Sequence, residues 1–318
     1  MTPTRDELAI QAAGLRKAFG DHVALDGIDL RVAAGTVFAL LGPNGAGKTT
    51  TVNVLTTLLT ADGGNAQVAG HDLRREPDRV RAAIGVTGQF SAVDNLLTGE
   101  ENLLLMADLR HLDNDARGRR VAELLDVFEL TEAASDRVST YSGGMRRRLD
   151  LAMTLIGEPR IIFLDEPTTG LDPRSRRVMW QIVRNLVTEG VTIFLTTQYL
   201  EEADQLAHRV AMLDRGAIVA EGTPSELKRL VPGGHIRLEF TDAAELDKAV
   251  RTLAVGVRDD DALTLQIPLE VSARSVRDLL EGLEAAAIDV GGLSVRTPDL
   301  DDVFLALTGR AREEVAAR

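Results

Sequence analysis

The sequence predicts a mainly parallel α/β domain followed by a small α+β domain. Short, continuous apolar runs at residues 37–41, 161–164 and 191–195 are typical of strands buried on both faces. Helix-like stretches lie between these runs, and strands that alternate with helices favour a parallel sheet. Residues 231–234 read Val-Pro-Gly-Gly, which is typical of a linker, and a new strand and helix pattern begins after them.

The first domain is predicted over residues 8–230. Residues 10–19 and 22–32 alternate apolar and polar side chains, as short strands do. The run 37–41 ends in glycine and is followed by a glycine-rich turn and a helix-like stretch. Residues 91–155 carry apolar side chains at helical spacing, which predicts a helical subdomain between the strands of the core.

The second domain is predicted over residues 235–310. In chain order the pattern indicates a strand, a helix, a strand, a helix, a strand and a final helix, at residues 235–240, 246–253, 262–269, 276–283, 288–295 and 299–307. A small α+β domain of ferredoxin-like type fits this order. No catalytic constellation lies in it, so dimer contact or regulation is its predicted role.

Composition excludes several classes of function. The 318 residues carry a net charge of −13, which argues against a nucleic-acid partner because phosphate backbones attract basic surfaces. Without cysteine, disulfides, thiolate catalysis and cysteine metal sites are excluded. Residues 1–10 show no apolar signal core, and no run of about 18 apolar residues predicts a membrane helix. Any role at a membrane is therefore expected to depend on a partner protein.

A glycine-rich loop at residues 42–49 matches the pattern G-x-x-x-x-G-K-[ST], between an apolar strand and a helix. Its glycines let backbone N–H groups turn toward one point, and the helix N-terminus adds to this anion site. Lys48 is expected to reach the β- and γ-phosphates of a nucleotide, and the Thr49 hydroxyl to bind Mg²⁺. The residues expected to hold the nucleotide in this segment are Gly42, Pro43, Asn44, Gly45, Ala46, Gly47, Lys48, Thr49 and Thr50.

Two adjacent carboxylates follow the apolar run 161–164. Asp165 stands where a P-loop protein places its magnesium-linked aspartate. Glu166 follows directly, so its side chain can point at the γ-phosphate and polarise the attacking water. Taken alone, the two residues could equally be solvated acids at a strand end; the phosphate loop upstream favours the catalytic interpretation.

Further motifs resemble those of the ABC ATPases over about residues 8–230. Residues 141–145, Tyr-Ser-Gly-Gly-Met, look like the signature motif of that family, usually written LSGGQ. Gln89 fits the Q-loop glutamine, Asp172 the D-loop, and Phe19 the aromatic residue that stacks on adenine. Taken alone, Phe19 would more often be a core residue and Gln89 a solvated one. The resemblance implies a RecA-like P-loop core with antiparallel β and α-helical subdomains.

The resemblance also implies a mechanism. Ser142, Gly143 and Gly144 would open a helix and direct donors at the γ-phosphate held by a second copy of the chain. A homodimer with two-fold symmetry would then enclose two ATP molecules. ATP and Mg²⁺ are the implied ligands, with Thr49, Gln89 and Asp165 around the metal. The implied catalytic residues are Lys48, Glu166 and Gln198.

Three segments narrow the resemblance to the daunorubicin-resistance type of drug-export ATPase, at residues 141–149, 196–204 and 300–309. This narrower resemblance reaches almost to the C-terminus. It implies a subunit at the cytoplasmic face of the membrane that powers export through a separate polytopic permease. The direction of transport rests on family analogy alone.

Two residues depart from the family pattern. Gln198 occupies the switch position where most ABC ATPases carry histidine; glutamine keeps an N–H donor but cannot become a cation. ATP binding is therefore expected to survive, without any titration of hydrolysis from this residue. Met145 replaces the usual glutamine, at a position that matters less than Ser142 and Gly144. The arginines at 146–148 are interpreted as a plain basic helix face, and the five histidines show no metal-ligand spacing.

Three other functions stay open. An importer subunit is the nearest alternative within transport. A soluble ABC protein of translation or DNA repair would usually carry two cassettes or a long coiled-coil insertion, and this chain shows one cassette and no such insertion. A nucleotide-sensing module that does not hydrolyse ATP is disfavoured by Glu166, while Gln198 keeps it open.

Overall fold

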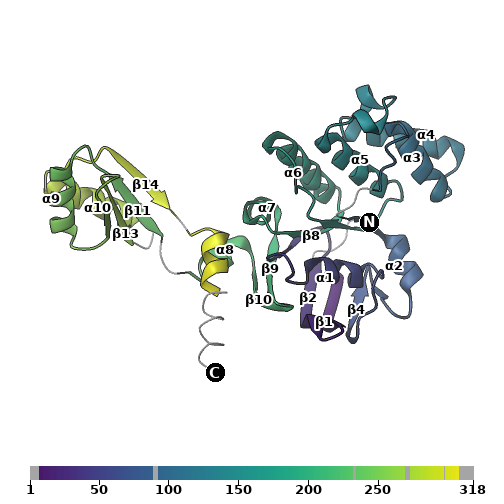
Figure 1. Cartoon of the computed structure of the whole chain (residues 1–318), viewed down its shortest axis with the longest axis horizontal. Coiled ribbons are helices and arrows are strands. Elements are labelled where there is room, and N and C mark those ends of the chain that lie inside the picture. Colours follow the sequence, from purple (N-terminus) through teal and green to yellow (C-terminus); the bar gives the residue numbers. More distant parts are fainter. Residues whose placement is uncertain (1–6, 89–91, 232–233, 269–272, 297, 308–318) are drawn as a thin grey trace. The chain divides into compact units, whose positions relative to one another are not determined.

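The structure is a computed structural model that describes residues 7–88, 92–231, 234–268, 273–296 and 298–307. It divides between Pro224 and Ser225 into two compact units, and each is described by itself (Figure 1). This division lies a few residues before the predicted linker at 231–234.

The first unit is built on a six-stranded sheet in the order β10-β9-β3-β8-β7-β6. All neighbours run parallel except β10, which is antiparallel to β9. The three apolar runs of the sequence are the central strands β3, β8 and β7, so the predicted parallel α/β core is confirmed. The strands are β3 (Val37–Leu41), β6 (Ile84–Thr87), β7 (Ile161–Asp165), β8 (Thr192–Thr197), β9 (Arg209–Asp214) and β10 (Ala217–Gly222).

A row of phenylalanines fixes the register of the three central strands. Phe38 on β3 lies opposite Phe194 on β8, and Phe163 on β7 lies on its other side. The ring centres are 5.5 Å apart in the first pair and 5.4 Å in the second, within the range of favourable aromatic contact. All three rings are buried. This row brings the carboxyl ends of β3, β8 and β7 to one edge of the sheet, where the candidate site lies.

A second, antiparallel sheet of the first unit has the order β2-β1-β4-β5. The first two strands form a long hairpin whose last pair is Phe19 opposite His22. The predicted strands at 10–19 and 22–32 are confirmed by this hairpin, whereas the sequence pattern did not predict its partner β4. The strands are β1 (Leu8–Phe19), β2 (His22–Ala33), β4 (Gly63–Val68) and β5 (His71–Asp72).

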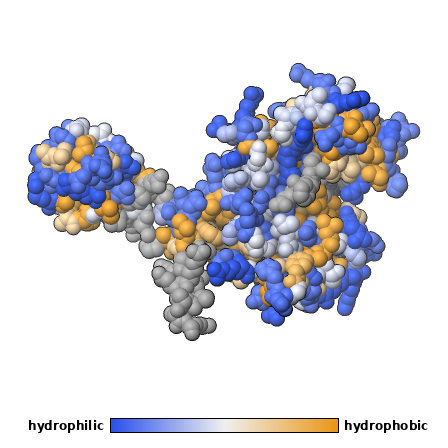
Figure 2. All heavy atoms as spheres, in the orientation of Figure 1, coloured by the Kyte–Doolittle hydropathy of each residue, from blue (hydrophilic) through white to orange (hydrophobic). Residues whose placement is uncertain are grey.

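Three helices form a separate layer of the first unit, between β6 and β7 in the chain (Figure 1). They are α3 (Gly99–Leu109), α4 (Asn114–Val127) and α5 (Gly143–Leu155), and they lie within residues 91–155, for which the sequence predicts a helical subdomain. Figure 2 shows hydrophobic residues among hydrophilic ones over α3 and α4, where Leu109 is 64% exposed. The other helices of this unit are α1 (Lys48–Leu55), α2 (Pro77–Ala83), α6 (Pro173–Thr188) and α7 (Leu200–Leu206).

The second unit begins within the short helix α8 (Pro224–Lys228), which spans the division. Its antiparallel sheet has the order β12-β13-β11-β14, and the helices α9 and α10 contribute to its buried core. Residues 300–307 are helical, as the sequence predicts, whereas the short edge strand β12 was not predicted. The elements are β11 (His235–Glu239), α9 (Ala243–Leu253), β12 (Val257–Asp259), β13 (Thr264–Pro268), α10 (Ala273–Ala285) and β14 (Gly292–Arg296).

Candidate functional site

The phosphate loop joins the end of β3 to the start of α1, as its sequence predicts. Gly47 caps α1 with a φ of 110°, a conformation that glycine adopts without steric cost. A Cβ atom on Gly42 would lie 2.3 Å from the carbonyl oxygen of Leu213, so a side chain cannot fit there. The loop therefore needs glycine for the turn at one position and for close packing at the other.

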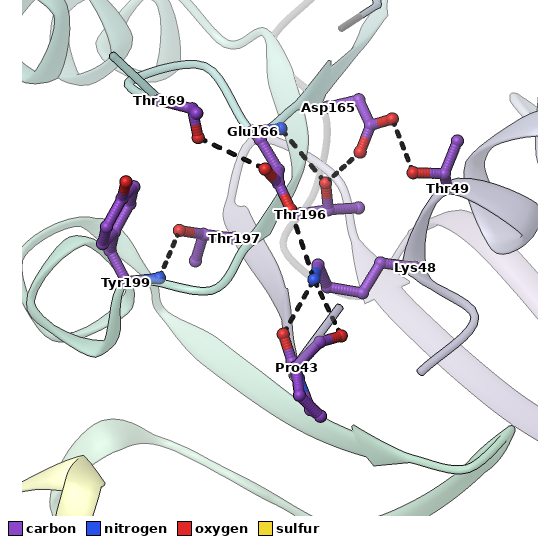
Figure 3. A network of polar contacts seen from close by, with 10 residues as sticks. Pro43, Lys48, Thr49, Asp165, Glu166, Thr169, Thr196, Thr197 and Tyr199 are labelled. Carbon is purple, nitrogen blue, oxygen red and sulfur yellow. Dashed lines mark hydrogen bonds and ion pairs between the residues drawn. The ribbon is translucent and has the colours of Figure 1, made fainter. Parts of the chain in front are cut away.

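Lys48 lies at the centre of a buried polar network (Figure 3). Its ammonium group donates hydrogen bonds to the carbonyl oxygens of Gly42, at 2.7 Å, and Pro43, at 3.1 Å. Its Nζ atom is also 3.3 Å from Oε1 of Glu166, and both side chains are less than a tenth exposed. The network holds a positive charge against the loop where a phosphate would be attracted.

Asp165, the last residue of β7, links this strand to the start of α1 through a side-chain hydrogen bond. The Thr49 hydroxyl donates to Oδ2 of Asp165 at 2.9 Å, and the Thr196 hydroxyl donates to Oδ1. Only 3% of Asp165 is exposed. Hydroxyl and carboxylate oxygens are the hard donors that Mg²⁺ prefers, so the chemistry of this pair fits that ion.

Glu166 turns away from the strand that carries Asp165. Its backbone has a φ of 50°, a left-handed conformation that is uncommon for a residue with a side chain. The turn is held by its N–H group, which donates to the Thr196 carbonyl oxygen at 3.1 Å, and by the Thr169 hydroxyl, which donates to Oε2 at 3.2 Å. Consecutive carboxylates therefore face different partners, with Asp165 toward Thr49 and Glu166 toward Lys48 (Figure 3).

A cavity of about 340 Å³ brings the phosphate loop together with the tip of the β1–β2 hairpin. The Phe19 ring is 51% exposed, which leaves an aromatic face free to stack on a flat base. The Lys17 ammonium lies 5.6 Å from the centre of that ring and 2.8 Å from Oδ1 of Asp62. His22 also lines the cavity and is not among the predicted site residues. The lining residues are Phe19, His22, Ala24, Asn44, Gly45, Gly47, Lys48, Thr49, Thr50 and Glu166.

Gln198 directly follows β8, which lies between β3 and β7. The phosphate loop and Glu166 follow those two flanking strands, so all three segments leave the same edge of the sheet. Adjacent hydrogen bonds support this placement, since Gly42 N donates to the Thr197 carbonyl oxygen at 3.3 Å. The half-buried Gln198 is thus beside the site, although it does not line the cavity.

Replacing Gln198 by histidine is expected to introduce a pH dependence. Glutamine does not titrate, so hydrolysis by the wild type has no step from this position. The Gln198→His variant should gain an activity step near pH ~6.5, the usual pKa of histidine. Initial rates of phosphate release across the pH range measure this, and identical profiles for the two proteins would contradict the proximity of residue 198 to the reacting phosphate.

The signature segment lies at the start of α5, as the sequence predicts. Ser142 caps this helix, and its hydroxyl oxygen accepts a hydrogen bond from the Met145 N–H group at 3.2 Å. A Cβ atom on Gly144 would lie 2.5 Å from the Ser175 hydroxyl, so the segment packs tightly on the first turn of α6. Asp172 caps α6, and hydrogen bonds from Ser175 and Arg174 lower the pKa of its carboxyl.

The structure does not bring every predicted residue to one place within the chain. None of the residues at 142–144, nor Asp172, lines the cavity that Lys48 and Glu166 line. Gln89, predicted to contact nucleotide and metal, lies outside the described residues. Phe19, Glu166 and residues of the phosphate loop line this one cavity, and Asp165 is joined to the loop through its hydrogen bond with Thr49.

Glu202 is a fully buried carboxyl that the sequence did not single out. It lies on α7, and its Oε1 accepts a hydrogen bond from the Trp180 indole at 3.2 Å. Burial raises the pKa of Glu202, and the hydrogen bond from the Trp180 indole opposes this increase without cancelling it. Folding therefore shifts the protonation equilibrium of Glu202 toward the neutral carboxyl.

Replacing Glu202 by glutamine should remove a pH dependence of stability. The pKa is higher in the folded than in the unfolded chain, so the contribution to stability is present below about pH 4.5 and is lost as the pH rises through the folded pKa. The unfolding midpoint of the wild type should therefore fall relative to that of Glu202→Gln as the pH rises above about 4.5. Trp180 is the single tryptophan, so its fluorescence follows unfolding of the first unit.

The matched control for this measurement is Glu189→Gln, which changes an exposed glutamate at the end of α6. It should follow the wild-type midpoint at every pH. A constant difference between wild type and Glu202→Gln across the pH range would show that Glu202 has no raised pKa.

Known proteins are similar in sequence to nearly the whole chain. The ABC transporter family model matches residues 25–169. A daunorubicin/doxorubicin resistance ATP-binding protein of Streptomyces peucetius is 48% identical, over 99% of this chain and 97% of the relative. The chain belongs to the ATP-binding proteins of ABC transporters. A daunorubicin resistance ATP-binding protein of Streptomyces coeruleorubidus is 49% identical to this ABC ATPase, over 96% of this chain and 98% of the relative.

A solved structure is similar to about two thirds of the ABC ATPase. It is the dimeric structure of an ATP-binding cassette in a post-hydrolysis state, bound to ADP and phosphate. The TM-score is 0.61 at 25% identity, over 67% of this chain and 98% of the other. As a member of this family, the chain binds and hydrolyses ATP to drive transport together with a membrane permease. Among the described residues, no helix combines the length and the apolar character needed to cross a membrane.

Proposed function

We propose that this ABC ATPase powers the export of a small drug-like molecule through a separate polytopic permease. The observation that supports the proposal is the match to daunorubicin resistance proteins along nearly the full length of both chains. An outward flux driven by ATP would lower the drug concentration inside the cell, which is one way in which an ATP-binding protein can give resistance. The proposed location is the cytoplasmic face of the membrane, where ATP is present.

The site geometry supports assigned roles in hydrolysis. Lys48 is positioned to hold the β- and γ-phosphates, because its charge is already directed into the phosphate loop. Thr49 and Asp165 would hold Mg²⁺, which neutralises phosphate charge when bound. Glu166 is separated from the metal ligands by its left-handed turn and would orient and polarise the attacking water. Gln89 is proposed to contact the metal and to link the nucleotide with the permease.

A homodimer is proposed to complete the site. The signature segment starts a helix and does not line the cavity of its own chain, so its donors are free to act on another phosphate. In the proposed arrangement Ser142, Gly143 and Gly144 cap the γ-phosphate held by a second copy. The dimeric cassette described above supports this arrangement by similarity. Hydrolysis would remove contacts that both chains share and let them separate.

The two domains are proposed to cover residues 8–230 and 235–310, joined at 231–234. The second would have a ferredoxin-like arrangement, since its elements follow the order strand, helix, two strands, helix, strand. Its sheet order β12-β13-β11-β14, antiparallel throughout, supports the same arrangement. Dimer contact or regulation remains its proposed role.

Transport in vesicles tests the proposed direction. The chain would be produced with the membrane permease that co-purifies with it, and inside-out vesicles would be supplied with Mg-ATP and daunorubicin, whose fluorescence reports its uptake. ATP-dependent accumulation is expected, and vesicles that carry Glu166→Gln are the negative control. ATP-driven loss of preloaded drug would indicate an importer, and hydrolysis without any associated membrane protein would indicate a soluble ATPase.

A further inference from the structure

The three consecutive arginines on α5 do not share one environment. Arg146 donates to the carbonyl oxygens of Val138, at 3.3 Å, and Ser139, at 3.0 Å. Arg148 pairs with Glu129 at 3.0 Å. These partners all belong to the helical layer. Arg147 instead contacts the sheet, so the interpretation of this segment as a plain basic face is wrong.

The Arg147 guanidinium holds the backbone on both sides of Glu166. Its Nε donates to the Pro167 carbonyl oxygen at 3.0 Å, and one terminal nitrogen donates to the Asp165 carbonyl oxygen at 3.1 Å. The other terminal nitrogen donates to the Gly88 carbonyl oxygen at 2.9 Å. The side chain is only 13% exposed, and this burial lowers the pKa of Arg147 while Asp150 and Asp165 oppose the decrease.

Asp150, one turn further along α5, extends the same set of contacts. Its carboxylate lies 3.3 Å from the Arg147 guanidinium and is almost fully buried. It also accepts a hydrogen bond from the Ala92 N–H group at 3.0 Å. Gly88 and Ala92 flank residues 89–91, so the Arg147–Asp150 pair holds the chain on both sides of that segment.

We propose that Arg147, paired with Asp150, is a positioning residue that sets the signature segment of α5 relative to the catalytic turn at Glu166. The planar guanidinium has five N–H donors in a fixed geometry, so it can donate hydrogen bonds to carbonyl groups of separate segments at the same time. Residues 142–144 lie on the first turn of the same helix, so a shift of Arg147 moves them too. The functional consequence rests on the proposed function, in which those residues act on the nucleotide of a second copy.

The Arg147–Asp150 pair thus connects the catalytic turn at Glu166 with the signature segment at 142–144, which is proposed to act on the nucleotide of a second copy. Hydrogen bonds from Arg147 to the carbonyl groups of Asp165 and Pro167 hold the backbone next to Glu166. The contacts of the pair with Gly88 and Ala92 hold the backbone on either side of residues 89–91. Loss of Arg147 should leave the phosphate loop intact, because Lys48 and Thr49 make their contacts without it. ATP affinity should therefore change much less than turnover.

Spin-label distances in the full chain test this proposal. The chain has no cysteine, so labels can be placed on cysteines introduced at Asp126, on α4, and Glu189, at the end of α6, both exposed. In the nucleotide-free protein Arg147→Met should broaden or split the distance distribution between the labels. The matched control Arg148→Met removes the neighbouring arginine, whose ion pair stays within the helical layer, and should keep the wild-type distribution.

Arg147→Lys provides a second variant in case Arg147→Met does not fold. Lysine keeps the positive charge beside Asp150, but its single ammonium group cannot donate hydrogen bonds to three carbonyl groups that lie in different directions. A broadened distribution is expected again, together with a turnover number at least about tenfold lower and an ATP dissociation constant within about threefold of the wild type.

A wild-type distance distribution in both Arg147 variants would overturn the proposal. Equal broadening in Arg148→Met would also overturn it, because the effect would then not depend on the contacts with the sheet. The distance measurement requires neither ATP nor hydrolysis. An inactive wild type would therefore contradict the proposed function and leave the role of the Arg147–Asp150 pair to be judged from the distances alone.

Discussion

Glu166→Gln is expected to bind ATP with little change and to lose nearly all turnover. The amide has the size of the carboxylate but cannot accept the proton of the attacking water, and positioned general bases contribute about 10²- to 10⁴-fold to rate. The Lys48 charge and the Thr49–Asp165 contact remain, so the nucleotide should still be held. ATP that is held and not cleaved should accumulate in a dimer, because both copies contact it in the proposed arrangement.

Two measurements on Glu166→Gln check this prediction. Phosphate release gives turnover, and size-exclusion chromatography with Mg-ATP, followed by nucleotide extraction, gives the dimer and its content. Glu189→Gln is the matched control, since it makes the same chemical change at an exposed position far along α6. Turnover at the wild-type rate in Glu166→Gln would remove this residue from its assigned role.

Lys48→Met should weaken ATP binding strongly. The methionine keeps most of the apolar stem but removes the ammonium that donates to Gly42 and Pro43 and pairs with Glu166. Hydrogen bonds to charged groups contribute about 1.5–3 kcal/mol, and the loss also leaves the buried Glu166 carboxylate without its cation. The ATP dissociation constant should rise by about 10- to 100-fold or more, since each tenfold change corresponds to about 1.4 kcal/mol.

Calorimetric titration with ATP and with ADP measures the effect of Lys48→Met. ADP lacks the γ-phosphate, so its affinity should fall less than that of ATP. Lys248→Met, in the second unit and part-exposed, is the matched control and should bind both nucleotides like the wild type. Equal losses for ATP and ADP would show that Lys48 does not discriminate the γ-phosphate.

The residues that carry the chemistry could be predicted from the sequence because they are contiguous. The phosphate loop spans residues 42–49 between one strand and one helix, and its glycines, lysine and threonine each act through local geometry. Asp165 and Glu166 likewise follow a recognisable buried strand. Parallel neighbours then bring these segments to one edge of the sheet, so fold class and site could be predicted together.

Contacts between distant segments could not be predicted in the same way. Nothing in the sequence distinguishes Arg147 from Arg146 and Arg148, and only the packing of α5 on the sheet makes one of them buried. Glu202 follows another glutamate on α7, and its burial depends on Trp180 of α6. Strand β4 contains two glycines and an asparagine, so its place in the sheet depends on pairing with β1 rather than on its own pattern.

The most direct test of the account is a structure of the Glu166→Gln protein with Mg-ATP. The γ-phosphate should lie beside Lys48 of one chain and accept hydrogen bonds from the segment at 142–144 of a second chain. A structure in which that segment turns away from every γ-oxygen, or in which ATP is bound by one chain without the other, would contradict it.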